Sequence, residues 1–278
     1  MIDAHQHFWA LERGDYGWLT PDFAPIYRDF GPVDLKPMLE RFGIEGTILV
    51  QAAPTVAETR YMLELARENG FIKGVVGWVD FEAEDAADRV AGLAEDPRLV
   101  GFRPMIQDIA DPDWMLKPSL APAYEALLAS ELVFDALTLP QHLQNLLKLA
   151  DRYPDLRMVV DHGSKPRIAA GEISGWAADM KAIADNTPAF CKLSGLVTEA
   201  GKTWTIDTLR PYVVHLLEVF GPQRLIWGSD WPVCTLACSY EDWVGMTSEL
   251  LKDLGEAEKQ AVMGGNAERV YLPGTAKL

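Results

Sequence analysis

The chain has 278 residues, of which 49% are hydrophobic and 24% charged, a balance typical of a globular protein with a sizeable core. Its formal net charge of −16 disfavours binding to nucleic acid or to an anionic membrane, because like charges repel. Three cysteines, an odd and small number, do not indicate a disulfide framework. The first residues show no signal-peptide pattern and no run of about 18 apolar residues occurs, so we expect a cytoplasmic protein.

Eight short runs rich in apolar and β-branched residues follow one another along the chain. They lie at residues 2–6, 46–52, 72–79, 99–103, 132–137, 157–161, 189–194 and 224–229. Stretches with helical spacing separate most of them, for example 56–69, 140–153 and 206–220. This alternation predicts a parallel sheet with helical crossovers, and eight such units predict a single α/β domain over residues 1–278, a (β/α)8 TIM barrel. The alternative, an open doubly wound sheet, lacks a glycine-rich phosphate loop after the first run.

Two connections that follow predicted strands are unusually long, at residues 8–32 and 104–119. In a barrel these loops lie at the carboxyl-terminal face, where active sites form, and loops of this length are more often functional than idle. The first connection is rich in aromatic residues. We expect most of them to pack the loop onto the barrel and one or two, such as Trp9 or Trp18, to line a pocket.

Polar residues that can bind a substrate or move a proton stand near the ends of almost all predicted strands. They are His5, His7, Gln51, Arg103, Asp135, Asp161, His162, Lys165, Lys192, Ser194 and Asp230. Alternation along a strand points His5 and His7 to the same side, where two imidazoles can hold one metal ion or one oxyanion. A structural role stays open for others, since Asp161 or Lys192 can form an internal ion pair and Ser194 can cap backbone groups.

Five segments of the chain carry a combined resemblance to one family. They are DAHQHFW at 3–9, GFRP at 101–104, DHGSKP at 161–166, CKLSGL at 191–196 and GSDWPV at 228–233. Together they resemble the amidohydrolase-related sugar lactonases, the hydrolases of L-fuconolactone and L-rhamnonolactone. The resemblance runs through nearly the whole chain and implies a TIM barrel that hydrolyses an aldonolactone to its open-chain acid. It also implies that Asp230 is the general base, and that His5, His7 and His162 face the lactone carbonyl or a metal.

The chain departs from the metal-rich plan of many amidohydrolases. The ends of the fourth and fifth strands offer Arg103 and Asp135, and the lysine that would be carbamylated to bridge two metals is absent. A catalytic zinc normally has three protein ligands and a water. His5, His7 and Asp230 can supply three ligands for one divalent metal, zinc or manganese, but we expect a site that need not contain it.

The predicted reaction is addition of water to a lactone carbonyl. We expect Asp230 to take a proton from the attacking water, while His162 and Arg103 meet the developing oxyanion. A fixed cation such as Arg103 is suited to gripping a carbonyl or carboxylate oxygen. No Gly-x-Ser-x-Gly elbow occurs, which disfavours an acyl-enzyme route.

The expected ligand is a small sugar lactone, and the sequence does not determine the oligomeric state. Gln51, Lys165 and Lys192 are expected to bind hydroxyl groups, and Trp231 the apolar face of the sugar. A dicarboxylate would need several strand-end arginines and only Arg103 is present, so a neutral six-carbon lactone such as L-fuconolactone is favoured. Two other functions stay open: a metal-dependent decarboxylase of a small unsaturated acid, and a barrel that binds a sugar acid without turnover.

Overall fold

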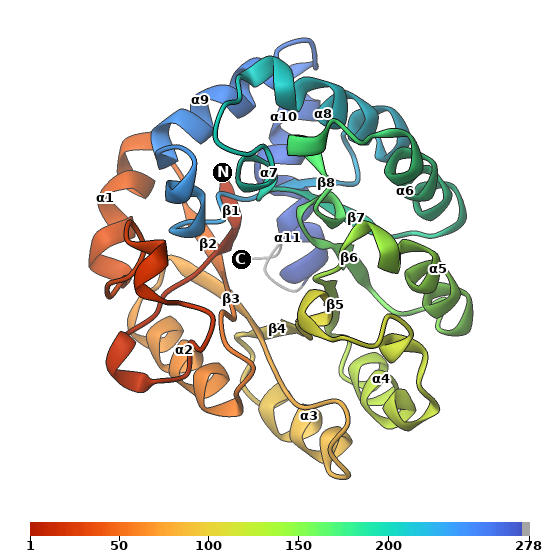
Figure 1. Ribbon diagram of the computed structural model, residues 1–278. Helices are drawn as coiled ribbons and strands as arrows, with labels where there is room; N and C mark the ends of the chain where they lie inside the picture. Colours follow the sequence, from red (N-terminus) through yellow and green to blue (C-terminus); the bar gives the residue numbers. More distant parts are fainter. Residues whose placement is uncertain (274–278) are drawn as a thin grey trace.

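The computed structural model describes residues 1–273 and contains one sheet of eight parallel strands that follow the order of the sequence (Figure 1). The strands are β1 Ile2–Gln6, β2 Gly46–Val50, β3 Ile72–Gly77, β4 Leu99–Phe102, β5 Val133–Ala136, β6 Met158–Val160, β7 Phe190–Leu193 and β8 Leu225–Trp227. The ring closes where β1 meets the segment after β8: Asp230 N donates to His5 O at 2.7 Å, and His7 N donates to Trp231 O at 2.7 Å. Each strand lies within the run that the sequence predicted.

The helices lie mainly on the outside of the ring of strands, but α11 (Asn266–Tyr271) lies at its centre in the view of Figure 1. They are α1 Pro32–Phe42, α2 Val56–Glu68, α3 Ala86–Ala94, α4 Ala121–Ala129, α5 Leu143–Arg152, α6 Ser174–Asn186, α7 Leu196–Glu199, α8 Ile206–Phe220, α9 Tyr240–Leu250, α10 Glu256–Gln260 and α11 Asn266–Tyr271. The predicted (β/α)8 barrel is therefore confirmed. None of the helices within residues 1–273 has both the length and the apolar character needed to cross a membrane.

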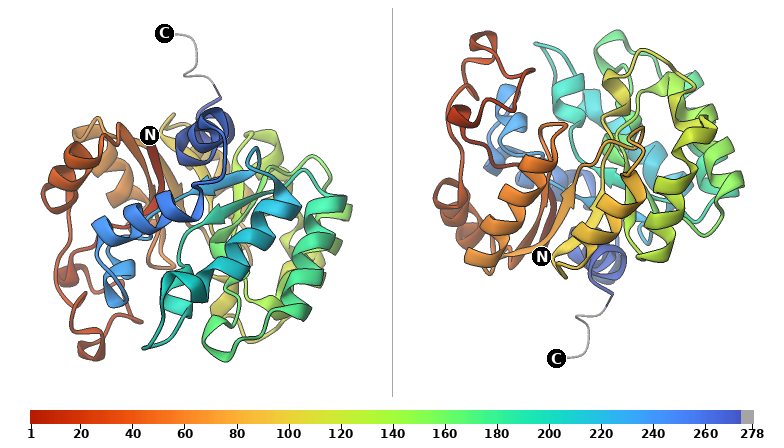
Figure 2. Two further views of the ribbon diagram at one scale, coloured as in Figure 1. Left: turned by 90° about the horizontal axis from the view of Figure 1, so that it is seen from above. Right: turned by 90° about the horizontal axis from the view of Figure 1, so that it is seen from below.

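The barrel interior is apolar at the amino-terminal end of the strands. The side chains that pack there come from the strands and from α11: Ile2, Ala4, Ile48, Val50, Val76, Val100, Val133, Val159, Ile226, Ala267, Val270, Tyr271 and Leu272. Figure 2 shows α11 across this end of the barrel, opposite the long loops that follow the strands. One end of the barrel is thus closed by a helix, and the other is left to the loops.

A slip of one residue in the pairing of β1 with β2 places the histidines of β1. Asp3 pairs with Thr47, but Gln6 pairs with Leu49, so β1 contains one extra residue between these points. An extra residue reverses the alternation of side chains along a strand. Ala4 therefore packs in the apolar interior while His5 also faces the inside of the barrel, and the next inward side chain is that of His7.

Candidate active site

A cavity of about 180 Å³ opens at the carboxyl-terminal end of the barrel. Its walls come from loops after most of the strands: His7, Trp18, Ala52, Arg103, Met105, Gln107, Asp108, Leu137, His162, Lys165, Thr198, Asp230 and Val233. Of the predicted site residues, the structure brings His7, Arg103, His162, Lys165 and Asp230 to this cavity. The charged side chains in its wall are two cations, Arg103 and Lys165, and two carboxylates, Asp108 and Asp230.

Asp230 carries the carboxylate at the centre of the imidazole groups. Its backbone is in the left-handed region, with φ of 57°, a strained conformation for a residue other than glycine. Its Oδ1 lies 3.3 Å from His7 Nε2 and 3.8 Å from His5 Nε2. Burial alone would raise the pKa of Asp230, but His162, His7 and His5 outweigh it and hold this pKa well below its usual value. The carboxylate is therefore ionised at neutral pH.

His7 is held in one orientation by the backbone of β2. Its Nδ1 lies 2.7 Å from Val50 O, and a carbonyl oxygen can only accept, so Nδ1 carries the proton of this bond. Burial lowers the pKa of His7, which favours the neutral ring. In the neutral ring Nε2 then has a free lone pair, and this lone pair faces the carboxylate of Asp230. A proton or a cation between His7 Nε2 and Asp230 Oδ1 would satisfy both atoms.

His162 enters the cavity from a strained turn after β6. Four consecutive residues, from His162 to Lys165, have φ between 49° and 59°. Three bonds support the turn: His162 Nδ1 with Ser194 Oγ at 2.8 Å, Trp176 Nε1 to Gly163 O at 2.7 Å, and Thr138 Oγ1 with Ser164 Oγ at 2.8 Å. Such strain persists only where the surroundings enforce it, and it concentrates at functional sites. This turn delivers both His162 and Lys165 to the cavity.

Close packing against the histidine rings leaves no room for side chains at two glycines. A Cβ atom at Gly195 would collide with the ring of His162, and one at Gly228 would lie 2.6 Å from His5 Cβ. The pKa of His162 is lowered to about 4 because the ring is buried, so it is a neutral imidazole at neutral pH. Ser194 decides which nitrogen of His162 carries the proton, because the hydroxyl group can donate or accept.

Arg103 crosses the floor of the cavity and is fixed by several partners. Its Nη2 donates to both the backbone oxygen and the side-chain oxygen of Gln51, and Gln51 Nε2 donates to Arg103 O at 2.8 Å. Its Nη1 lies 3.4 Å from Asp161 Oδ2 and 3.3 Å from His5 Nε2. Gln51 therefore orients Arg103 and does not line the cavity, which differs from the predicted role in substrate binding.

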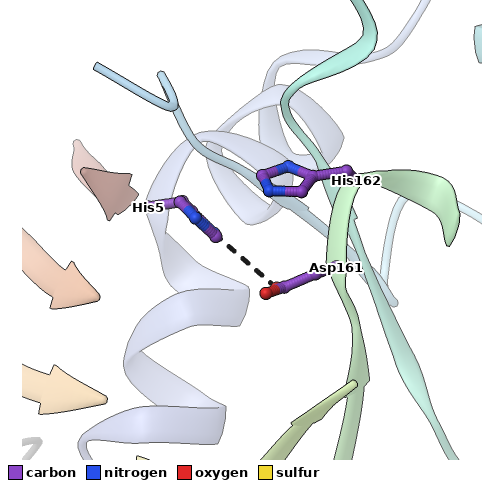
Figure 3. A group of neighbouring side chains, drawn as sticks. All are labelled: His5, Asp161 and His162. Atoms are coloured by element: carbon purple, nitrogen blue, oxygen red, sulfur yellow. Dashed lines mark ion pairs between the residues drawn. The ribbon is translucent and has the colours of Figure 1, made fainter. Parts of the chain in front are cut away.

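A fully buried ion cluster lies beneath the cavity. Lys192 Nζ is 2.5 Å from Asp135 Oδ2, 3.0 Å from Asp161 Oδ1 and 3.2 Å from His5 Nδ1. Figure 3 shows His5 opposite Asp161 and His162, with His5 Nδ1 3.6 Å from Asp161 Oδ1. Burial opposes ionisation of Asp161, but Lys192 and His5 hold its pKa well below the usual value. The structure thus shows the internal ion pair that was the structural alternative for Asp161 and Lys192.

Besides Gln51, two further predicted substrate contacts do not line the cavity. Lys192 is wholly buried with its ammonium group occupied, so it cannot reach a substrate hydroxyl in the cavity. Trp231 is buried against Phe8 and Phe30, with ring centres 6.0 and 5.1 Å away, and does not line the cavity. The aromatic side chain in the cavity wall is Trp18, whose Nε1 donates to Ala52 O at 2.7 Å.

Gln107, Asp108 and Thr198 also line the cavity, and none of them was among the residues predicted from the sequence. The first two lie in the long connection after β4, so its length was the signal that could have found them. A larger cavity of about 490 Å³ adjoins the first and shares Trp18, Met105 and Asp108 with it. We place the chemistry in the smaller cavity, because the imidazoles and the buried carboxylate are there.

The residues fit one divalent metal ion. The ligand atoms of His5, His7 and Asp230 all lie within 4.8 Å of one another, and two imidazoles with a carboxylate suit zinc or manganese. The lone pair of His7 Nε2, which faces Asp230, fits such an ion as well. Arg103 Nη1 lies 3.3 Å from His5 Nε2, so a fixed positive charge shares this space and weakens the attraction for a cation.

Comparison with known proteins places the chain in a family. The family model described as amidohydrolase matches residues 2–272. A protein of Burkholderia ambifaria called L-fucono-1,5-lactonase is 47% identical, covering 97% of this chain and 94% of its own length. A second L-fucono-1,5-lactonase, from Burkholderia multivorans, is 35% identical over 100% of this chain and 98% of its own.

A solved structure gives the same result for the fold. The crystal structure of an amidohydrolase from Burkholderia multivorans, with bound zinc, has a TM-score of 0.92 and 35% identity, and covers 97% of this chain and 98% of that one. The predicted kinship with amidohydrolase-related sugar lactonases is thus confirmed by the family model and by both named relatives. The family match spans almost the whole chain, residues 2–272, and the eight parallel strands agree with it: the chain belongs to the amidohydrolase family.

Proposed function

We propose that this single barrel hydrolyses a neutral sugar lactone, with L-fucono-1,5-lactone as the leading substrate, to the open-chain aldonic acid. The observation that carries the proposal is an ionised carboxylate, Asp230, in contact with buried imidazoles at the edge of a small cavity. The names of the two relatives supply the substrate class.

In the proposed mechanism Asp230 is the general base. Its carboxylate accepts a proton from water while the water oxygen attacks the lactone carbonyl carbon. Collapse of the tetrahedral intermediate breaks the bond to the ring oxygen, and that oxygen receives the proton from Asp230. His162 Nε2 carries a hydrogen and donates it to the carbonyl oxygen if Ser194 donates to Nδ1, so this proton arrangement supports the oxyanion.

Arg103 has a more restricted part than a free oxyanion donor. Both of its terminal nitrogens are engaged, with Gln51, Asp161 and His5. Its charge nevertheless lies at the cavity wall and stabilises negative charge that develops on the carbonyl oxygen. Lys165, which lies 4.0 Å from Glu199, is the remaining cation in the wall and is free to bind a substrate hydroxyl.

The charges of the cavity support a neutral substrate. The wall contains two cations, Arg103 and Lys165, and two carboxylates, Asp108 and Asp230. Arg103 also pairs with the buried Asp161, so the wall offers no surplus of positive charge to a dicarboxylate. The ring of Trp18 offers an apolar surface against which the apolar face of a deoxy sugar can pack. Gln107 Oε1 is buried without a hydrogen-bond partner in the described chain, and a substrate hydroxyl can donate to it.

We also propose that one divalent metal ion can bind to His5, His7 and Asp230 without being required. The zinc in the Burkholderia multivorans structure supports this, because that protein is 35% identical over nearly the same length. A bound ion would polarise the lactone carbonyl and lower the pKa of water. The residues that orient the substrate, Arg103 and Lys165, act in the same way with or without it.

A hydrolysis screen tests the proposal. A panel of aldonolactones is followed with a pH indicator, before and after prolonged chelation and after return of zinc or manganese. We expect turnover of L-fucono-1,5-lactone above turnover of galactono- and arabinonolactone, and activity that survives chelation. Activity that disappears on chelation and returns with metal would make the ion essential and overturn the metal-independent part.

Absence of turnover on every lactone would overturn the proposed function itself. In that case the metal-dependent decarboxylase becomes the next candidate, because His5, His7 and Asp230 can hold an ion. It is tested by release of carbon dioxide from small unsaturated acids with manganese or zinc added.

A further inference from the structure

A series of polar contacts runs from α11, the helix that closes the barrel, to His5, one of the histidines beside Asp230. It begins at Tyr271, at the end of α11, whose hydroxyl group donates to Asp135 Oδ1 at 2.6 Å. The other oxygen, Asp135 Oδ2, accepts from Lys192 Nζ at 2.5 Å. Lys192 Nζ in turn lies 3.2 Å from His5 Nδ1 and 3.0 Å from Asp161 Oδ1. The contacts therefore span the barrel interior from its closed end to its open end.

The members of this series hold one another through short contacts. Lys192 Nζ is hydrogen-bonded to Asp135 and lies 3.0 Å from Asp161 Oδ1 and 3.2 Å from His5 Nδ1. Both oxygens of Asp135 are used, one by Tyr271 and one by Lys192. These side chains are fully buried or nearly so, and water cannot replace a lost partner without opening the barrel.

The charges of the cluster also balance. Asp135 and Asp161 carry two negative charges, and Lys192 and Arg103 carry two positive charges when all four are ionised. Burial raises the pKa of Asp135 to about 6 in spite of Lys192, so the Tyr271 hydroxyl, which favours the ionised carboxylate, matters for this balance. Removing the hydroxyl group leaves a buried carboxylate oxygen without a partner.

We propose that Tyr271 is a positioning residue for catalysis. By holding Asp135 against Lys192, it fixes the ammonium group that sets the places of His5 and Asp161 beneath the cavity. The helix α11 then has a second role besides closing the barrel, because its last residue, Tyr271, positions His5 and its neighbours beneath the cavity. The expected effect on lactone turnover rests on the proposed function.

The test is Tyr271→Phe, which removes one hydroxyl group and keeps the ring. The matched control is Tyr124→Phe, since the buried Tyr124 donates its hydroxyl to Met115 O at 3.1 Å outside the cluster. We expect Tyr271→Phe to lower kcat about 10- to 100-fold with little change in KM. The control should keep kcat. Equal kcat in the two variants would overturn the proposal.

A second measurement does not depend on the substrate. The nitrogen NMR spectrum of the side chains contains signals from the histidine rings. The signal of His5 is identified because it is absent from the spectrum of His5→Gln. We expect Tyr271→Phe to shift the His5 signal and to leave those of His142 and His215, which lie outside the cluster. An unshifted His5 signal would overturn the proposal even if no lactone were turned over.

If Tyr271→Phe does not fold, Asp135→Asn tests the same connection from the next residue. It keeps the shape of the side chain and removes the charge that holds Lys192. We expect the same shift of the His5 signal and an equal or larger loss of kcat. Wild-type kcat and an unshifted His5 signal in folded Asp135→Asn would overturn the proposal.

Discussion

Two layers of charged side chains occupy the barrel interior, one above the other, and they differ in how completely they are satisfied. In the lower layer, Lys192 contacts His5 and lies between two carboxylates, Asp135 and Asp161. In the upper layer, Asp230 faces imidazoles that are neutral at neutral pH, and no fixed cation lies within 4.0 Å of it in the described chain. The ammonium group of the lower layer is paired with carboxylates, whereas the carboxylate of the upper layer is not paired with a fixed cation.

The difference supports the proposal that the upper layer, and not the lower one, carries out the chemistry. A carboxylate with a permanent ion-pair partner is a poor base, because proton transfer to it must break the pair. Asp230 is ionised but has no permanent ion-pair partner. The lone pair of His7 Nε2 beside it can accept a proton or bind a cation. The same residue types thus serve architecture below and reactivity above, according to the partners that the fold supplies.

The largest expected effect is in the upper layer. Asp230→Asn keeps the shape of the side chain and removes the base, so kcat should fall about 10²- to 10⁴-fold while the fold is retained. Steady-state kinetics on the best lactone and a circular-dichroism melt measure the two properties. Asp185→Asn, at an exposed carboxylate on α6, is the control and should keep full activity. Near-normal turnover in folded Asp230→Asn would sink the role of Asp230 as base.

The lower layer should respond in stability. Lys192→Met leaves two buried carboxylates without their shared cation, and the free energy of unfolding should fall by about 3–5 kcal/mol. Lys181→Met is the matched control, because Lys181 makes an ion pair of the same 2.5 Å length with Asp185 on the protein surface. Surface pairs contribute little, so this variant should unfold in urea almost as the wild type does. Equal losses in the two variants would remove the distinction between the layers.

A third kind of buried carboxylate, Glu58, extends the comparison. It accepts backbone N–H groups of Ala52 and Ala53, and burial raises its pKa to about 8. Between pH 5 and pH 8 the folded protein then binds a proton that the unfolded chain has lost, so this stability is lost as pH rises. The difference in unfolding free energy between wild type and Glu58→Gln should fall by about 1.4 kcal/mol per pH unit in this range. A difference independent of pH would show that Glu58 is already ionised.

The smallest effect is expected at the rim of the upper layer. Trp18→Ala removes apolar wall from the catalytic cavity, so KM should rise about tenfold while kcat changes little. Trp78→Ala is the comparison, because Trp78 lines only the neighbouring cavity of about 490 Å³. A rise of KM in Trp78→Ala equal to that in Trp18→Ala would mean that substrate occupies both cavities.

Much of the upper layer could be predicted from the sequence, because it depends on where strands end. Parallel strands end at one face, so His7, Arg103, His162 and Asp230 were expected to lie together, and they do. The fold followed from the same alternation of strands and helices. Neither inference needs knowledge of side-chain depth.

Depth is what the sequence does not reveal. Lys192 is one residue before the end of β7, so its side chain lies in the layer below the cavity, and no pattern shows which layer a strand residue joins in a tilted barrel. Trp231 follows Asp230 directly, but the left-handed backbone of Asp230 turns the next side chain toward Phe30. Tyr271 is 136 positions from Asp135, a contact that only the closed barrel creates.

Closure of the ring has a consequence for synthesis of the protein. The reactive centre joins His7 to Asp230, which are 223 positions apart, and the backbone bonds that bring them together are the last rung of the barrel. During synthesis on the ribosome His5 and His7 are made first. The carboxylate of Asp230 is added only after β8 has been made. With Asp230 as the proposed base, activity requires complete assembly, and a growing or severed chain that ends before Asp230 lacks the proposed catalytic carboxylate.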